Sequence, residues 1–118
     1  MNVTFEITGV RNGLGKVRGL AFGKDNGGFP DEISKASAKA EVDAEKGSVK
    51  LTFYKLKIKE AAFSIFHDEK ELGRIEKTFL GVPKQGIAVS NWKGLGKPTY
   101  KKSIVKLKPQ MRVSLKYF

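Results

Sequence analysis

Residues 67–69 bring together three side chains able to do acid–base chemistry. The run holds the sole histidine of the sequence, His67, followed at once by Asp68 and Glu69. An imidazole titrates near neutrality and serves as a general base, whereas carboxylates serve as acids, bases or cation ligands. The connection that follows ends at a hydroxyl and an amide. The candidate loop site therefore comprises His67, Asp68, Glu69, Ser90 and Asn91.

Catalysis by His67 requires a nucleophile and an orienting group within hydrogen-bond reach. Neighbours on a strand point to opposite faces, which separates the side chain of His67 from that of Asp68. Ser64 is three residues from His67, an odd number, so its hydroxyl is also expected on the opposite face. Glu69 and Glu71 could form an acid–base pair on one strand face, but nothing else in the chain requires it. We therefore predict no catalytic residue and no enzyme, with a metal-dependent hydrolase centred on His67 as the second alternative.

Calcium binding is the metal chemistry that this run most nearly resembles. Calcium loops place oxygen ligands at alternate positions around a glycine, and Asp68, Glu71 and Glu76 could supply them. Two cations, Lys70 and Arg74, stand where ligands are needed. The sequence has no cysteine, which excludes disulfides and zinc–thiolate sites. We predict no metal site and no cofactor, and whether the run binds an ion is left open.

Positive charge is concentrated in the last third of the chain. The net charge is +11; residues 77–118 carry ten basic side chains and no acidic one, while residues 1–76 are nearly balanced. Such asymmetry indicates an anionic partner, with a solvated lysine face as the plain alternative. The candidate anion-binding residues are Trp92, Lys93, Lys97, Tyr100, Lys101 and Lys102.

Aromatic rings among lysines can stack on sugar rings or bases while the lysines neutralise uronate or phosphate. Lysine outnumbers arginine in this third, although arginine reads phosphate better, and no RNA-binding fingerprint is present. We expect an anionic polymer or a cell-envelope component as partner, with a nucleic-acid or anionic-polysaccharide binding protein as the first alternative. The oligomeric state is left open.

The elements that must position these residues are strands. Val3, Phe5 and Ile7 alternate with polar residues, as do Val49 and Leu51, which gives each strand one buried face. Strands are expected near residues 3–8, 16–22, 38–42, 48–54, 61–67, 86–90, 103–107 and 111–118. Seven or eight short strands separated by turns predict an all-β, antiparallel Greek-key β-sandwich of about seven strands.

A chain of 118 residues predicts a single domain spanning residues 1–118. No apolar run approaches the roughly 20 residues that cross a bilayer, so no transmembrane segment is expected. The opening residues lack the pattern of a signal peptide. We expect the protein to be periplasmic or extracellular if a leader peptide was removed, and cytoplasmic otherwise.

Residues 67–91 resemble a family of small bacterial domains, the domain-of-unknown-function family two-one-four-one. The family's order is HDE, a glycine, FLG-x-P, a glycine and SN, which this sequence matches without insertion. Matching residues are His67, Asp68, Glu69, Gly73, Phe79, Leu80, Gly81, Pro83, Gly86, Ser90 and Asn91, together with Gly28, Phe29 and Pro30. The opening run ITGVRNGLG also resembles the family's first hairpin.

The resemblance implies an immunoglobulin-like or transthyretin-like β-sandwich, exported to the periplasm or cell surface, with no established activity. Lys70, Lys101 and Lys102 replace residues that are polar or acidic in the family, which makes this member cationic. The chain is thus expected to be an uncharacterised, non-enzymatic, exported accessory or binding module.

The connection itself is predicted to be structural. In this interpretation His67 ends a strand and hydrogen-bonds a loop backbone. Phe79 and Leu80 are expected to pin the connection into the core, where truncation of a buried ring is costly. The residues expected to fix its path are Gly73, Gly81, Pro83 and Gly86.

Overall fold

The short runs of alternating apolar and polar residues form strands. The computed structural model describes residues 1–94 and 96–118. The strands are β1 (Val3–Val10), β2 (Lys16–Phe22), β3 (Ala38–Asp43), β4 (Gly47–Phe53), β5 (Glu60–Asp68), β6 (Ile87–Val89), β7 (Ile104–Lys106) and β8 (Gln110–Ser114). Two helical turns, η1 (Ile33–Lys35) and α1 (Tyr100–Ser103), lie between strands. In this described part of the chain, no helix has the length and apolar character needed to cross a bilayer.

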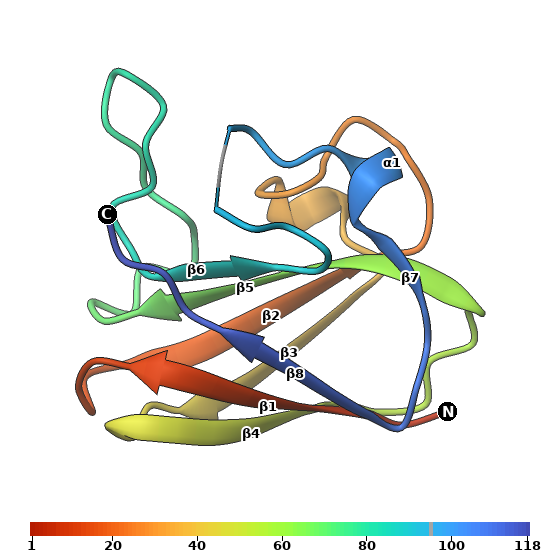
Figure 1. Ribbon diagram of the computed structural model, residues 1–118, viewed down its shortest axis with the longest axis horizontal. Helices are drawn as coiled ribbons and strands as arrows, with labels where there is room; N and C mark the ends of the chain where they lie inside the picture. Colours follow the sequence, from red (N-terminus) through yellow and green to blue (C-terminus); the bar gives the residue numbers. More distant parts are fainter. Residues whose placement is uncertain (95) are drawn as a thin grey trace.

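The strands form two sheets (Figure 1). One has the order β4-β1-β8, and the other has the order β3-β2-β5-β6 with β7 also paired to β5. The predicted all-β sandwich is confirmed, with eight strands in the described residues where about seven were expected. Greek-key connectivity of the immunoglobulin or transthyretin type stays a prediction.

One strand pair departs from the antiparallel expectation. β1 and β8 run parallel, with Thr4 opposite Gln110 and Ile7 opposite Val113. The chain crosses from β7 in one sheet to β8 in the other. β8 therefore starts next to the start of β1, and the two strands run in the same direction. The backbone N–H of Thr4 donates to the carbonyl of Pro109 at 2.9 Å, which fixes this entry.

The main core lies between the two sheets and is built on three phenyl rings. The centroid of Phe63 lies 4.8 Å from that of Phe5 and 5.4 Å from that of Phe53, in edge and tilted contacts. Gly19 on β2 leaves room for them, because a Cβ there would lie 2.8 Å from the Phe53 ring. Such packing is the largest stabilising contribution in a sandwich of this size.

β5 is the central strand, and both of its faces are covered. Residues 61–68 are all buried. Phe63 and Ile65 face the main core, as the alternation predicts, and Phe66 on the other face packs with Leu20 and Phe22. Aromatic and aliphatic side chains from the segment after β2 and from α1 cover that second cluster. The end of β5 is therefore fixed firmly enough to carry the loops that follow.

The expectation that Phe79 and Leu80 are pinned into the core is wrong. Residues 69–86, here called the arm, extend away from the sandwich as a narrow hairpin (Figure 1). Phe79 is 97% exposed and Leu80 is 77% exposed at its tip. The backbone N–H of Thr78 donates to the Val82 carbonyl at 2.8 Å, and Gly81 adopts a φ of 84°. This turn satisfies its own backbone groups and directs the two side chains outward.

Replacing Phe63 with Ala should lower the free energy of unfolding by about 3–5 kcal/mol, because a buried ring leaves a cavity. The matched change Phe79→Ala should cost less than about 0.5 kcal/mol, since it removes an exposed side chain. Urea denaturation of both variants measures the difference. Comparable losses in the two variants would contradict the outward orientation of the arm tip.

Candidate ligand-binding groove

His67, the last but one residue of β5, is fully buried with both ring nitrogens hydrogen-bonded. Nε2 lies 2.8 Å from the carbonyl oxygen of Leu14, and Nδ1 lies 2.7 Å from the hydroxyl of Tyr117. A carbonyl oxygen only accepts, so Nε2 donates to Leu14, and in the neutral ring Nδ1 then accepts from Tyr117. That hydroxyl also accepts from the backbone N–H of Arg11 at 3.1 Å. His67 thus joins β5 to the β1–β2 loop and to the C-terminal segment.

Asp68 ends β5 with a fully buried side chain. Its carboxylate accepts from Arg18 Nε at 2.7 Å and from the backbone N–H groups of Gly73 and Leu72 at 2.7 and 2.9 Å. Burial raises the pKa of this carboxyl, but the hydrogen bonds from Arg18 and the two N–H groups outweigh it and leave the pKa below its ordinary value. The ionised carboxylate therefore holds the first turn of the arm on β2.

Glu69 binds the β1–β2 loop through two partners. Arg11 contacts it with two nitrogens, Nη2 at 2.5 Å from Oε1 and Nε at 3.1 Å from Oε2, and Asn12 Nδ2 donates to Oε2 at 2.6 Å. The hydrogen bond from Arg11 lowers the pKa of Glu69, burial opposes that shift, and Asn12 adds to it. The Arg11 guanidinium also lies over the Tyr117 ring, 4.6 Å from its centroid.

In the run 67–69, here called the clasp, all three side chains hydrogen-bond to other segments of the chain. Each of its three side chains is held by a different set of partners, and both nitrogens of the His67 ring are engaged. Within residues 1–94 and 96–118, no group of three His, Asp or Glu is placed to hold a metal ion. The geometry suits a junction that ties loops together, with no open position for a substrate at the imidazole.

Ser90 and Asn91 lie apart from the clasp, at the other end of β6. Ser90 Oγ accepts from the backbone N–H of Phe63 at 2.9 Å and donates to the Ser103 carbonyl at 2.5 Å. Asn91, with a φ of 57°, donates to the Ile104 carbonyl at 3.4 Å. The five residues of the candidate loop site are thus not brought together, and these two fix the turn that leaves β6.

The six candidate anion-binding residues divide among three places. Trp92 and Lys97 line a groove beside the arm, and Trp92 also borders a second cleft with Lys93 and Lys102. Tyr100 packs its ring 6.2 Å from that of Phe29; burial raises the pKa of its hydroxyl, with Glu60 and Asp25 adding to the shift. Lys101 is exposed on the single turn of α1. One continuous patch is therefore not formed.

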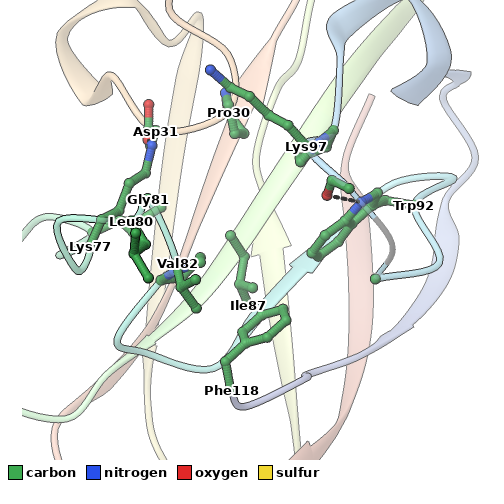
Figure 2. Close-up of a pocket in the computed structure, with 15 residues that line it drawn as sticks. Pro30, Asp31, Lys77, Leu80, Gly81, Val82, Ile87, Trp92, Lys97 and Phe118 are labelled. Carbon is green, nitrogen blue, oxygen red and sulfur yellow. Dashed lines mark hydrogen bonds and ion pairs between the residues drawn. The ribbon is translucent and has the colours of Figure 1, made fainter.

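The arm groove has a volume of about 450 Å³. Figure 2 shows Leu80 and Val82 of the arm on one side, Trp92 and Phe118 on the other, and Ile87 between them. The rings of Trp92 and Phe118 lie 6.3 Å apart at 40°. Trp92 Nε1 donates to the Gly96 carbonyl at 3.2 Å, which sets the orientation of the indole. The groove thus presents an aromatic wall facing an aliphatic one.

Lysines border this apolar groove. Lys97 extends across it toward Pro30 (Figure 2), and Lys77 forms an ion pair with Asp31 that ties the arm to the segment after β2. Phe118 is the wall residue that sequence reasoning missed. Phe118 follows Tyr117 in an alternating run, so the sequence pattern indicates that Phe118 faces outward. Its position beside Trp92 depends on the fold and could not be predicted from that pattern.

Replacing Asp68 with Asn should lower the free energy of unfolding near neutral pH by about 2 kcal/mol or more, because charge-assisted hydrogen bonds are lost. The folded pKa of Asp68 lies below the unfolded value of 3.8. The contribution of the carboxylate is thus complete above that value and is lost as the pH falls through the folded pKa. Urea denaturation should show the difference between wild type and variant shrinking below about pH 4.

The matched control is Glu45→Gln, which changes an exposed carboxylate between β3 and β4. It should leave the free energy of unfolding within about 0.5 kcal/mol of wild type. A D68N deficit that stayed constant across the acid range would contradict the assigned role of the carboxylate.

Comparison with known proteins gives one match. The model of a family described as "Uncharacterized protein conserved in bacteria (DUF2141)" matches residues 5–114. No curated protein and no solved structure is significantly similar to the chain. The match covers both sheets, the clasp and the arm, as the resemblance of residues 67–91 predicts. The chain belongs to this uncharacterised bacterial family.

Proposed function

We propose that the chain is a non-enzymatic, exported binding module that takes an anionic polysaccharide of the cell envelope in the arm groove. The observation that carries this proposal is the pairing of two aromatic rings, Trp92 and Phe118, with a lysine in one concavity of about 450 Å³. Ligand sites commonly have volumes of about 300–1,000 Å³, mostly apolar walls and a few placed polar groups.

The two kinds of side chain in the groove select a ligand with two kinds of surface. The rings of Trp92 and Phe118 offer flat apolar faces, which suit the C–H face of a sugar ring. Lys97 at the border offers a point charge to a carboxylate. A uronic-acid polymer carries both features in each repeat, so successive sugars can contact the rings and the ammonium group together.

Long-range charge favours the same class of ligand. The net charge of +11, with residues 77–118 free of acidic side chains, attracts polyanions in a salt-sensitive manner. Lysine supplies point charges without the planar fork with which arginine reads phosphate and base edges. This composition supports a carbohydrate polyanion more than sequence-specific nucleic-acid binding.

The proposal of a module without catalysis rests on the contacts of the clasp. His67 is fully buried and bonded at both nitrogens, and Asp68 and Glu69 are each paired with an arginine. The second alternative, a metal-dependent hydrolase at this point, would need those contacts to open. Millimolar calcium or zinc should therefore leave the melting temperature unchanged, and a rise with either ion would favour the hydrolase.

Export is supported by the resemblance of residues 67–91 to exported domains, and the proposed envelope ligand requires it. Osmotic-shock fractionation of cells that express the gene from its native 5′ end should recover the protein with the periplasmic or surface fraction. Recovery with cytoplasmic markers alone would reject export and strengthen the nucleic-acid alternative.

Binding can be tested by titrating the protein with a uronic-acid oligosaccharide in a calorimeter. Lys97→Gln should weaken binding about three- to fivefold, and Trp92→Ala should weaken it at least about fivefold, the effects expected for one screened charge and one stacked ring. Lys50→Gln removes the same charge from β4, at the opposite edge of the molecule (Figure 1), and should have no effect beyond a small nonspecific loss.

Two reference ligands separate the alternatives. A neutral oligosaccharide of the same length should bind weakly, because it lacks the carboxylates. Single-stranded DNA that bound as tightly as the uronate, with the same loss in K97Q, would replace the polysaccharide by nucleic acid as the ligand. Equal binding of the uronate by wild type, K97Q and W92A would remove the groove from the proposal.

A further inference from the structure

The two sheets leave one side of the sandwich open, between β6 and β8. β6 ends the path of the five-stranded sheet, and β8 ends the three-stranded one. Ile87 and Lys116 join them by a pair of backbone hydrogen bonds, each 2.9 Å long. That bridge is isolated, so the strands meet at one point and then separate.

The backbone groups beyond this bridge point into the opening. Pro109 and Leu115 bond to β1, and alternate residues of a strand direct their N–H and C=O groups to opposite sides. Arg112 and Ser114 therefore direct theirs away from β1, toward β6. In the register set by Ile87 and Lys116 the next pair would be Val89 and Ser114, but among the described residues no hydrogen bond joins these two.

The opening is a cleft of about 720 Å³ with a basic border. Lys93, Lys102, Arg112 and Lys116 line it, and no lining residue among those described is acidic. Arg112 also contacts Glu6 of β1, with Nε 3.2 Å from Oε1. Lys116 Nζ donates to the Gly94 carbonyl at 3.3 Å and lies 5.4 Å from the centroid of the Phe118 ring. Lys93, Lys102 and Lys116 therefore have no carboxylate partner among the described residues. This surface is here called the basic cleft.

We propose that the basic cleft binds an extended, acidic polypeptide segment, which adds to β8 as a fourth strand of the β4-β1-β8 sheet. In the described part of the chain, no neighbouring strand or loop bonds to the N–H and C=O groups that Arg112 and Ser114 direct away from β1. These groups repeat with the two-residue period of a strand, and only another peptide backbone matches that period. A polysaccharide can satisfy the charges but not this ladder. The basic cleft adjoins the arm groove and shares Ile87, Trp92 and Gly94 with it, but the inferred ligand and its contacts with β8 go beyond the proposed function.

The side chains around the cleft specify the sequence pattern of the partner. On its inner side lie Ile87, Val89 and Leu115, all buried and apolar. On its outer side lie the exposed side chains of Arg112 and Lys116. A segment that alternates small apolar residues with glutamate or aspartate would place each kind of side chain against its complement.

The test is hydrogen exchange, followed by NMR, on the intact protein with a short peptide alternating glutamate and valine. Strand addition should slow exchange of the Arg112 and Ser114 amides about tenfold or more and leave Lys50, on the far β4, unchanged. Affinity should fall as salt rises. A peptide with N-methyl groups on the edge that faces β8 should bind about tenfold more weakly, because its charge is kept while hydrogen bonds are lost.

Two protein variants separate the backbone from the charge. Ser114→Pro removes an N–H that faces the cleft while Val113 and Leu115 keep their bonds to β1, and should weaken peptide binding about tenfold. The double change Lys102→Gln and Arg112→Gln should weaken it in low salt, whereas Lys46→Gln with Lys50→Gln, on and before β4, should not. If S114P does not fold, the N-methylated peptide still tests the ladder.

Several results would overturn the proposal. One is equal binding of the methylated and unmethylated peptides; another is no slowing of the Arg112 and Ser114 amides at saturation. Slowing of those amides by a uronate oligosaccharide alone would assign the cleft to the polymer. Sedimentation could also show that the wild-type protein dimerises with rising concentration and that the K102Q/R112Q variant does not. That result would place a second copy of this chain in the cleft.

Discussion

The clasp at the end of β5 is the constraint on which the rest of the structure depends. β5 is buried along residues 61–68, so packing on both faces of the strand holds its last residues in place. His67 then binds the C-terminal segment through Tyr117, and Asp68 binds the first turn of the arm. The C-terminal segment carries Phe118, and the arm carries Leu80. The two walls of the arm groove are therefore positioned by adjacent residues of one strand.

Residue type at the clasp follows from what each contact demands. A histidine in the Nε2–H form can donate to a carbonyl at one nitrogen and accept from a hydroxyl at the other, which matches Leu14 and Tyr117. Burial raises the pKa of the Tyr117 hydroxyl, which keeps it a donor. Asp68 and Glu69 each meet an arginine as well as other donors, so their charges are compensated where they are least exposed to water.

The strands could be predicted from sequence because alternation is a local property. Val3 to Ile7 and Val49 to Phe53 show it plainly, and the bond from His67 to a loop carbonyl also agrees with the prediction. Contacts between distant segments could not be predicted: Arg11 and Glu69 are 58 positions apart. The parallel pairing of β8 with β1 and the cleft beside β8 depend on where the chain crosses from one sheet to the other. Such a crossing produces no periodic pattern in the sequence.

Phe79 shows why the arm departs from the sequence prediction. Aromatic residues in a glycine-punctuated connection usually pack inward, since burial of a ring is worth about 1.5–3 kcal/mol. Here the turn between Thr78 and Val82 closes its own hydrogen bonds, and Gln85, buried at the base, bonds to the backbone of Arg74 and Glu76. The hairpin is thus complete without the ring, and no local rule compels Phe79 toward the core.

The distribution of ion pairs explains how an ordinary sandwich acquires a basic side. Six of the twelve carboxylates of residues 1–76 pair with cations from the same part of the chain, as Asp68 and Glu41 do with Arg18. Among the described residues, the ion pairs of the last third involve only Lys77 and Arg112. Its remaining lysines have no carboxylate partner among the described residues, and they lie on the arm, the turn after β6, α1, β7 and the segments on either side of β8. Lys93, Lys102, Arg112 and Lys116 line the opening between β6 and β8, so positive charge borders the side of the fold where the two sheets stay apart.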